Sequence, residues 1–167
     1  MIARGPASND AAPSRESAAV ARGIGRLFAR NGIWCLPEMP LRNGRRADLM
    51  GIDERGHVIV VEIKVARGDL LGDAKWPDYL DFCDRFFWGV TPMLDRACLE
   101  TEAYRPECCG IIAADAYDAE IIRPAPLRPL AAARRKVEVE RLARAALRRH
   151  LCASDPACAP WACDDSA

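Results

Sequence analysis

The chain has 167 residues, of which 50% are hydrophobic and 29% are charged, a composition typical of one soluble globular domain. Its 24 basic and 24 acidic side chains cancel, which excludes a strongly cationic or anionic protein. The sequence contains no signal peptide pattern and no apolar run of the roughly 18 residues needed to cross a bilayer. We therefore expect a cytoplasmic protein without membrane contacts, whose eight cysteines stay reduced.

The N-terminal part of the chain is expected to contain a disordered leader and then a helix. Residues 1–13 are rich in Ala, Pro, Ser and Asn, a composition that does not favour a packed structure. From Ser14 on, apolar residues recur at helical spacing, and Asn31-Gly32 is a typical helix stop. The apolar positions are Val20, Ile24, Leu27 and Phe28. We predict that a domain covering residues 14–151 begins with this helix.

Three strands joined by two tight turns are predicted next. The strands cover residues 33–36, 45–52 and 57–65. Asn43-Gly44 is a strong hairpin signal between the first two strands, and residues 53–56 supply a second turn. The third strand is the clearest, because its β-branched run is interrupted only by two charged residues. These segments predict a three-stranded meander.

The rest of the chain mixes helices and strands. Residues 69–85 are predicted to be helical with a break near Pro77, and residues 130–151 form a predicted basic, amphipathic helix. Further strands are expected at residues 86–90, 110–114 and 119–122, and a flexible tail that contains cysteines at residues 152–167. The order of elements predicts the α/β class, with a mixed central sheet flanked by helices.

The two charged residues of the third strand indicate a site. Side chains alternate across a strand, so Glu62 and Lys64 share one face, whereas the other face is wholly apolar. An antiparallel hairpin would bring Asp48, from the second strand, near Glu62 at one end of the sheet. Two converging carboxylates suit a hard cation such as Mg²⁺, and a neighbouring ammonium can stabilise the charge of a phosphate under attack. The alternative is a salt-bridged pair at a strand end.

Asp48, a turn and then Glu62-Ile63-Lys64 on an apolar strand resemble the PD-(D/E)XK nuclease superfamily, although Ala47 stands where that name has proline. The resemblance implies a restriction-endonuclease-like α-β-β-β-α-β core. Over about residues 16–147, the chain also resembles the MmcB-like family of DNA repair proteins, which is associated with DNA damage tolerance. The segments that carry this second resemblance are Gly44–Asp48, Val61–Lys64, Lys75–Tyr79 and Ala132–Lys136.

The resemblance implies roles for individual residues. Asp48 and Glu62 would bind Mg²⁺ or Mn²⁺, with the backbone carbonyl of Ile63 as a further ligand. Lys64 would stabilise the transition state and help to position the attacking water. Some relatives carry a Gln-x-x-x-Tyr element on the following helix, and Lys75 and Tyr79 have that spacing here. Because residues four apart share a helix face, both are candidate catalytic residues.

Other charged residues are candidate ligands or DNA contacts. Glu38 and Glu16 are candidate metal ligands, with a surface position as the alternative for each. Arginine suits bidentate contact with phosphate, so DNA contacts are predicted for Arg42, Arg45 and Arg46 at the hairpin and for Arg134, Arg135 and Lys136 on the last helix. The alternatives are a solvated hairpin tip and a solvated helix face.

These observations together predict a metal-dependent nuclease that hydrolyses phosphodiester bonds of DNA in repair or damage tolerance. The rival interpretation is a non-catalytic adaptor or DNA-binding module that keeps the nuclease fold, because fold and motif do not prove turnover. RNA as the substrate and a homodimer are left open. The expected partners are DNA and other repair proteins.

Overall fold

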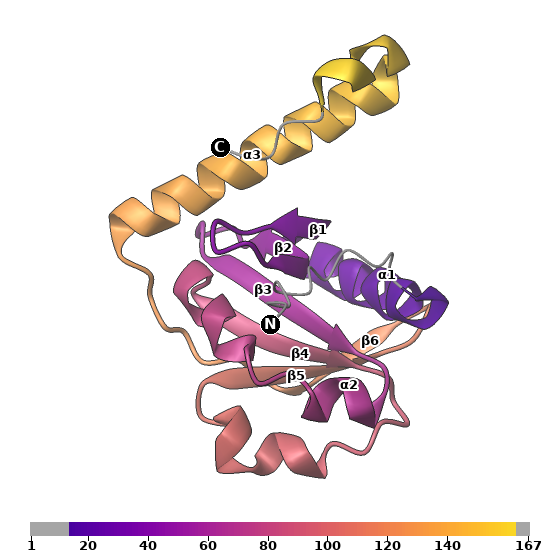
Figure 1. The fold of residues 1–167 in the computed structure, drawn as a ribbon, viewed down its shortest axis with the longest axis vertical. Helices are drawn as coiled ribbons and strands as arrows, with labels where there is room; N and C mark the ends of the chain where they lie inside the picture. The colour runs from indigo at the N-terminus through magenta and orange to yellow at the C-terminus, as the bar shows by residue number, and fades with distance from the viewer. Residues whose placement is uncertain (1–13, 163–167) are drawn as a thin grey trace, which may run out of the picture.

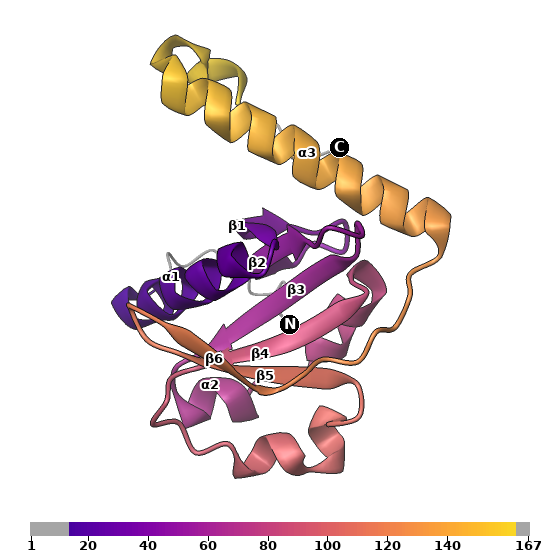
Figure 2. The same cartoon turned by 180° about the vertical axis from the view of Figure 1, so that it is seen from behind.

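The computed structural model describes residues 14–162, which form a six-stranded sheet with helices on both faces (Figure 1 and Figure 2). The strands are β1 (Trp34–Pro40), β2 (Arg46–Ile52), β3 (Val58–Lys64), β4 (Arg85–Val90), β5 (Cys109–Ala114) and β6 (Ala119–Arg123). The α-helices are α1 (Arg15–Arg30), α2 (Arg67–Leu71) and α3 (Ala132–Ser154). Short 3-10 helices cover Trp76–Phe82, Ala97–Glu100, Glu102–Tyr104 and Pro156–Trp161.

The sheet is mixed, and its strand order follows the chain from β1 to β6. The first three strands form an antiparallel meander, β3, β4 and β5 are parallel, and β6 returns antiparallel to β5. This arrangement confirms the predicted fold class, an α/β protein with a mixed central sheet flanked by helices and an α-β-β-β-α-β order of elements.

Strand β3 lies inside the sheet and separates two hydrophobic cores. Its residues Ile59, Val61 and Ile63 pack in the core beneath α1. Val58 and Val60 point to the other core, which α3 and the 3-10 helix at Trp76–Phe82 cover. The predicted alternation of this strand is confirmed, and it explains why Glu62 follows Val58 and Val60 on the face away from α1.

A buried aspartate fastens the segment before α3 to the sheet. The Asp84 carboxylate accepts hydrogen bonds from the backbone amides of Val58 and Leu130, each at 2.8 Å, and pairs with Arg135 at 2.5 Å. Burial opposes ionisation of Asp84, but these hydrogen bonds outweigh it and hold its pKa below the usual value. The chain after β6 is thereby held to the start of β3, and α3 then packs against β1, β2 and β3.

Some boundaries differ from the predicted ones. The segment predicted as one broken helix at residues 69–85 divides into α2 and a 3-10 helix, because Gly72 ends the first and Pro77 begins the second. Strand β1 continues to Pro40, and α3 continues to Ser154, with helical turns in part of the segment expected to be a flexible tail. The predicted leader at 1–13 and the last five residues lie outside the described residues. Within residues 14–162, no helix is long and apolar enough to span a membrane.

Candidate active site

The β-sheet pairing between β1 and β2 is interrupted at Glu38 and Asp48. The residues on either side pair across the two strands, Pro37 with Leu49 and Met39 with Ala47, but Glu38 and Asp48 do not. Glu38 also has a left-handed backbone conformation, with φ of 54°, which costs free energy for any residue other than glycine. Such strain persists only where the surrounding structure enforces it, and it concentrates at functional sites.

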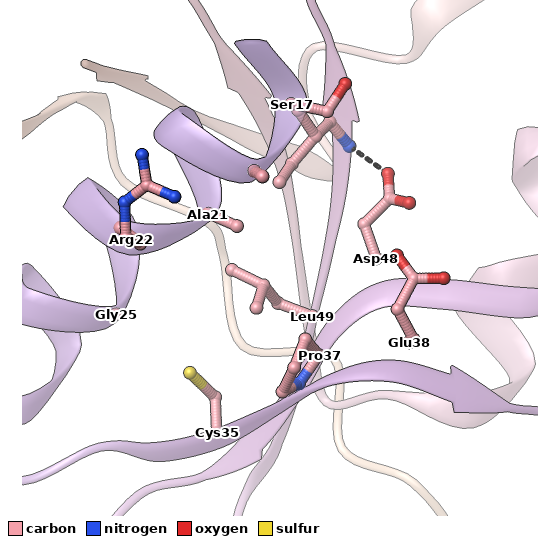
Figure 3. A pocket seen from close by; sticks show the side chains of 11 residues that line it. Ser17, Ala21, Arg22, Gly25, Cys35, Pro37, Glu38, Asp48 and Leu49 are labelled. Atoms are coloured by element: carbon pink, nitrogen blue, oxygen red, sulfur yellow. Dashed lines mark hydrogen bonds between the residues drawn. The ribbon is translucent and has the colours of Figure 1, made fainter. Parts of the chain in front are cut away.

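Asp48 is joined to β3 by a short hydrogen bond. Its Oδ2 accepts from the backbone amide of Ile63 at 2.6 Å, as the dashed line in Figure 3 marks. Burial raises the pKa of Asp48 to about 6, although the hydrogen bond from Ile63 and the charge of Lys64 act in the opposite direction. The bond places the Asp48 carboxylate beside the Glu62–Lys64 end of β3, as the hairpin predicts.

Glu62 is almost completely buried, with 3% of its surface exposed. Its Oε1 accepts a hydrogen bond from Lys64 Nζ at 3.0 Å, whereas Oε2 is buried without a well-formed hydrogen bond from the described residues. Burial and then the charge of Asp48 raise the pKa of Glu62 to about 8. A buried carboxylate oxygen without a donor is costly, and a bound cation would remove that cost.

Lys64 is held by two carboxylates. Its Nζ contacts Glu62 Oε1 at 3.0 Å and Asp73 Oδ2 at 2.8 Å. Burial lowers the pKa of Lys64, but these two carboxylates outweigh it, so the pKa is raised and the ammonium stays charged. Asp73 was not among the predicted site residues, because it lies in the loop after α2 and reaches Lys64 through the path of that loop, which no local sequence pattern shows.

Tyr79 is buried next to Glu62, whereas Lys75 is exposed. The buried Tyr79 hydroxyl donates to the backbone oxygen of Arg46 at 3.2 Å, and burial together with the charge of Glu62 raises the Tyr79 pKa well above its usual value. Lys75 and Tyr79 were expected on one face of an α-helix, but Lys75 precedes a 3-10 helix that begins at Trp76, and in such a helix residues three apart, not four, share a face.

The remaining candidates from the hairpin differ in their contacts. Arg46 Nε pairs with Glu38 Oε2 at 2.5 Å, and the Glu38 charge contributes to the raised Asp48 pKa. Arg45 donates to Asp78 Oδ2 at 2.9 Å, while Arg42 is exposed. Arg46 and Glu38 therefore adjoin the Asp48 carboxylate. Glu16, the other candidate metal ligand, is exposed in the first turn of α1.

The three candidate DNA contacts on α3 have different surroundings. Arg135 is bound to the buried Asp84 and so takes part in the fold. Arg134 lies over the Phe82 ring, with 5.4 Å from its guanidinium carbon to the ring centroid. Lys136 is exposed and lies 3.8 Å from Glu140. Arg134 and Lys136 are thus exposed and take no part in a buried ion pair, and a role in binding DNA stays a prediction for all three.

A cleft opens beside the Asp48 and Glu38 carboxylates, between α1 and the strands β1, β2 and β3. It has a volume of about 440 Å³, and Figure 3 shows Asp48 and Glu38 side by side at one end of it, with Arg22 across from them on α1. The other side chains that line it are Ser17, Ala18, Ala21, Cys35, Pro37, Leu49 and Ile63, together with Gly25.

The donor set at this end of the sheet has features that suit a divalent cation. Two carboxylates with raised pKa values and one buried oxygen without a donor are features that a cation would satisfy. Within residues 14–162 there is no group of three or more His, Cys, Asp or Glu placed to bind a metal. Mg²⁺ and Mn²⁺ keep several water ligands and can be bound by one or two carboxylates, which Asp48 and Glu62 would supply here.

Comparison with known proteins points to DNA repair. The family model described as DNA repair protein MmcB-like matches residues 4–157. A solved structure described as SPO1766 protein of unknown function from Silicibacter pomeroyi is similar, with 40% sequence identity and a TM-score of 0.75, and the match covers 88% of this chain and 94% of that one. No curated protein matches the chain.

Proposed function

Because this chain belongs to the MmcB-like family of DNA repair proteins, we propose that it is a metal-dependent nuclease that hydrolyses phosphodiester bonds of DNA. The observation that carries the proposal is the meeting of Asp48, Glu62 and Lys64 at one end of β2 and β3. Two carboxylates beside a charged ammonium match the Asp…Glu-x-Lys motif of the PD-(D/E)XK superfamily, and the order of elements in the sheet agrees with the core of that superfamily.

Asp48 and Glu62 would hold Mg²⁺ or Mn²⁺, with the Ile63 backbone carbonyl as the further ligand that the motif implies. The ion would supply Lewis-acid polarisation of the phosphate and a more acidic water. The hydrogen bond from the Ile63 amide fixes the Asp48 carboxylate, and the strained Glu38, paired with Arg46, lies next to it.

Lys64 would stabilise the negative charge that accumulates on the phosphate in the transition state and help to position the attacking water. Its ammonium is already held by Glu62 and Asp73 at 3.0 and 2.8 Å, so it needs little reorganisation during the reaction. Asp73 acts here as a positioning residue. Tyr79 is buried close enough to Glu62 for the Glu62 charge to raise the Tyr79 pKa.

One observation favours the rival function, a DNA-binding or adaptor module without turnover. The charge of Lys64 is compensated within the fold by Glu62 and Asp73, which contact its ammonium at 3.0 and 2.8 Å. The position of the Lys64 ammonium therefore does not depend on a metal. A protein that had lost catalysis could keep this cluster of charges for structural reasons.

Cleavage assays decide between the two functions. End-labelled single-stranded, duplex, flapped and branched DNA, together with matched RNA, are incubated with Mg²⁺ or Mn²⁺ and either wild-type protein or Asp48→Ala. Cleavage of DNA by the wild type that is lost in the variant supports the nuclease and identifies its substrate. Binding of DNA by both proteins, with no product from either, would favour the adaptor module, and cleavage of RNA alone would move the proposal to that substrate.

A further inference from the structure

The cleft between α1 and the sheet is lined mainly by apolar groups. Leu49 and Ile63 form its wall on the sheet side, and Pro37 and Cys35 extend that wall along β1. Burial raises the pKa of the Cys35 thiol to about 11, so this side chain is neutral and adds to the apolar surface. A volume of about 440 Å³ lies within the roughly 300–1,000 Å³ of small-ligand sites.

The opposite wall is a face of α1 with small side chains. Ala18, Ala21 and Gly25 follow one another at helical spacing along this face. A Cβ atom placed on Gly25 would meet nothing within 4 Å, whereas one placed on Gly23 would lie 2.3 Å from the backbone oxygen of Asp115. The helix is therefore tightly packed on its β5–β6 side and open on its cleft side.

Charges are placed at the rim of the cleft. Asp48 and Glu38 lie at one end, and Arg22 lies on the α1 wall (Figure 3). Two other arginines of α1 are engaged, since Arg26 donates to the backbone of residues 116 and 117 and Arg30 pairs with Asp118. Arg22 forms no ion pair within the part of the chain that the structure describes, so its charge is available to a phosphate.

We propose that this cleft binds one unpaired nucleotide of a DNA strand, with the sugar and base between α1 and Leu49 and the adjoining phosphates at Arg22 and at the cation that Asp48 would hold. The inference rests on the proposed function, since the same Asp48 carboxylate belongs to both sites. A volume of about 440 Å³ is that of a site for one small molecule, so a base pair with its two sugar-phosphate strands is too large for the cleft. The site therefore selects unpaired ends, flaps or extruded bases over continuous duplex.

Binding assays with a matched pair of variants test this site. Gly25→Leu fills the cleft, and Gly25→Ala adds only a methyl group at the same position. Both are better helix formers than glycine, so both are expected to fold, which a circular dichroism melt verifies. Binding is measured by fluorescence anisotropy with Ca²⁺ in place of Mg²⁺, using a duplex with a single-stranded overhang and a blunt duplex of the same length.

We expect Gly25→Leu to weaken binding of the overhang by about tenfold, the order of magnitude of one lost base contact, and to leave binding of the blunt duplex within twofold of wild type. Gly25→Ala should bind both as the wild type does. Arg22→Ala should weaken binding of the overhang more than Arg30→Ala, which removes the same charge from the same helix outside the cleft.

Equal binding of the overhang by wild type and Gly25→Leu, or an equal loss for both DNAs, would overturn the proposal. The proposed nuclease activity and the proposed nucleotide site can be disproved independently of each other. If wild type cleaves DNA in an Asp48-dependent way but Gly25→Leu binds and cleaves normally, the nucleotide site is wrong and the nuclease stands. If no protein cleaves DNA but Gly25→Leu selectively loses the overhang, the nucleotide site stands without the nuclease.

Discussion

At the scale of single residues, the site depends on how four charged groups share a small buried space. Asp48 and Glu62 both have raised pKa values because of burial, and Lys64 keeps its charge because Glu62 and Asp73 flank it. If Glu62 binds a cation, Asp73 is the remaining carboxylate that holds the Lys64 ammonium in place. The effect of Asp73 on the rate of DNA cleavage can be measured separately from its effect on the affinity for DNA.

Asp73→Asn is expected to lower the rate of single-turnover cleavage about tenfold, which corresponds to the loss of one charge-assisted contact to Lys64. Affinity for DNA should change less than twofold, because Asp73 carries no positive charge that DNA could contact. Asp69→Asn, an exposed position in the same segment, is the matched control. An unchanged rate in Asp73→Asn would show that Lys64 is positioned without it.

At the scale of elements, helix α1 has opposite requirements on its two faces. Gly23 lies where a Cβ atom would meet backbone oxygens of Asp115 and Asp118 at 2.3 and 2.6 Å, and Gly25 lies where nothing is within 4 Å. The two glycines are two positions apart in the chain, and they have the same intrinsic helix propensity. Their substitutions should therefore separate packing from propensity.

We expect Gly25→Ala to raise the free energy of unfolding by about 0.5–1 kcal/mol through helix propensity. Gly23→Ala should lower it by about 1–3 kcal/mol, because the backbone must shift to admit the methyl group. Urea denaturation of both variants at pH 7 measures the two effects. Changes of the same sign would contradict the packing described for α1.

Asp84 joins the start of β3 to the segment before α3 and to Arg135 of that helix. From its lowered pKa we expect the stability of the protein to depend on pH. Its pKa is lower in the folded protein than in the unfolded chain, so its contribution to stability is complete above about pH 4 and is lost as the pH falls through the folded-state pKa. Asp84→Asn should destabilise the protein by about 3 kcal/mol at pH 7, since Arg135 loses its buried partner.

The difference in unfolding free energy between Asp84→Asn and wild type should shrink as the pH falls below about 4. Urea titrations at several pH values between 7 and 3 provide the measurement. Asp81→Asn, an exposed position three residues earlier, controls for general charge effects. A difference that stays constant over this range would mean that the Asp84 contacts do not depend on its charge.

The central elements of this fold were predictable from sequence because they depend on local patterns. The alternation of β3 and the turns on either side of β2 were enough to place Asp48 near Glu62. The contact of Lys64 with Asp73, the strained backbone of Glu38 and the 3-10 geometry of Trp76–Phe82 were not predictable. Each of these arises from the path of a loop or an irregularity in pairing, which tertiary packing imposes.

At the scale of the whole molecule, the two faces of the sheet have different surroundings. One face is covered by α3 and by a core rich in aromatic rings, in which the ring centroids of Phe86 and Trp88 are 5.1 Å apart. The other face lies against α1, where the cleft opens and Asp48 lines one end of it (Figure 3). Glu62 and Lys64 lie at the end of β3, next to Asp48.

The central claim is that Asp48 and Glu62 form one site for a divalent cation. Titration with Mn²⁺, followed by the electron paramagnetic resonance signal of the free ion, measures this without any DNA. We predict one bound Mn²⁺ per wild-type chain, a loss of affinity of at least about tenfold in both Asp48→Asn and Glu62→Gln, and no change in Asp81→Asn. Absence of bound Mn²⁺ in the wild type, or equal binding by all of these proteins, would contradict the account.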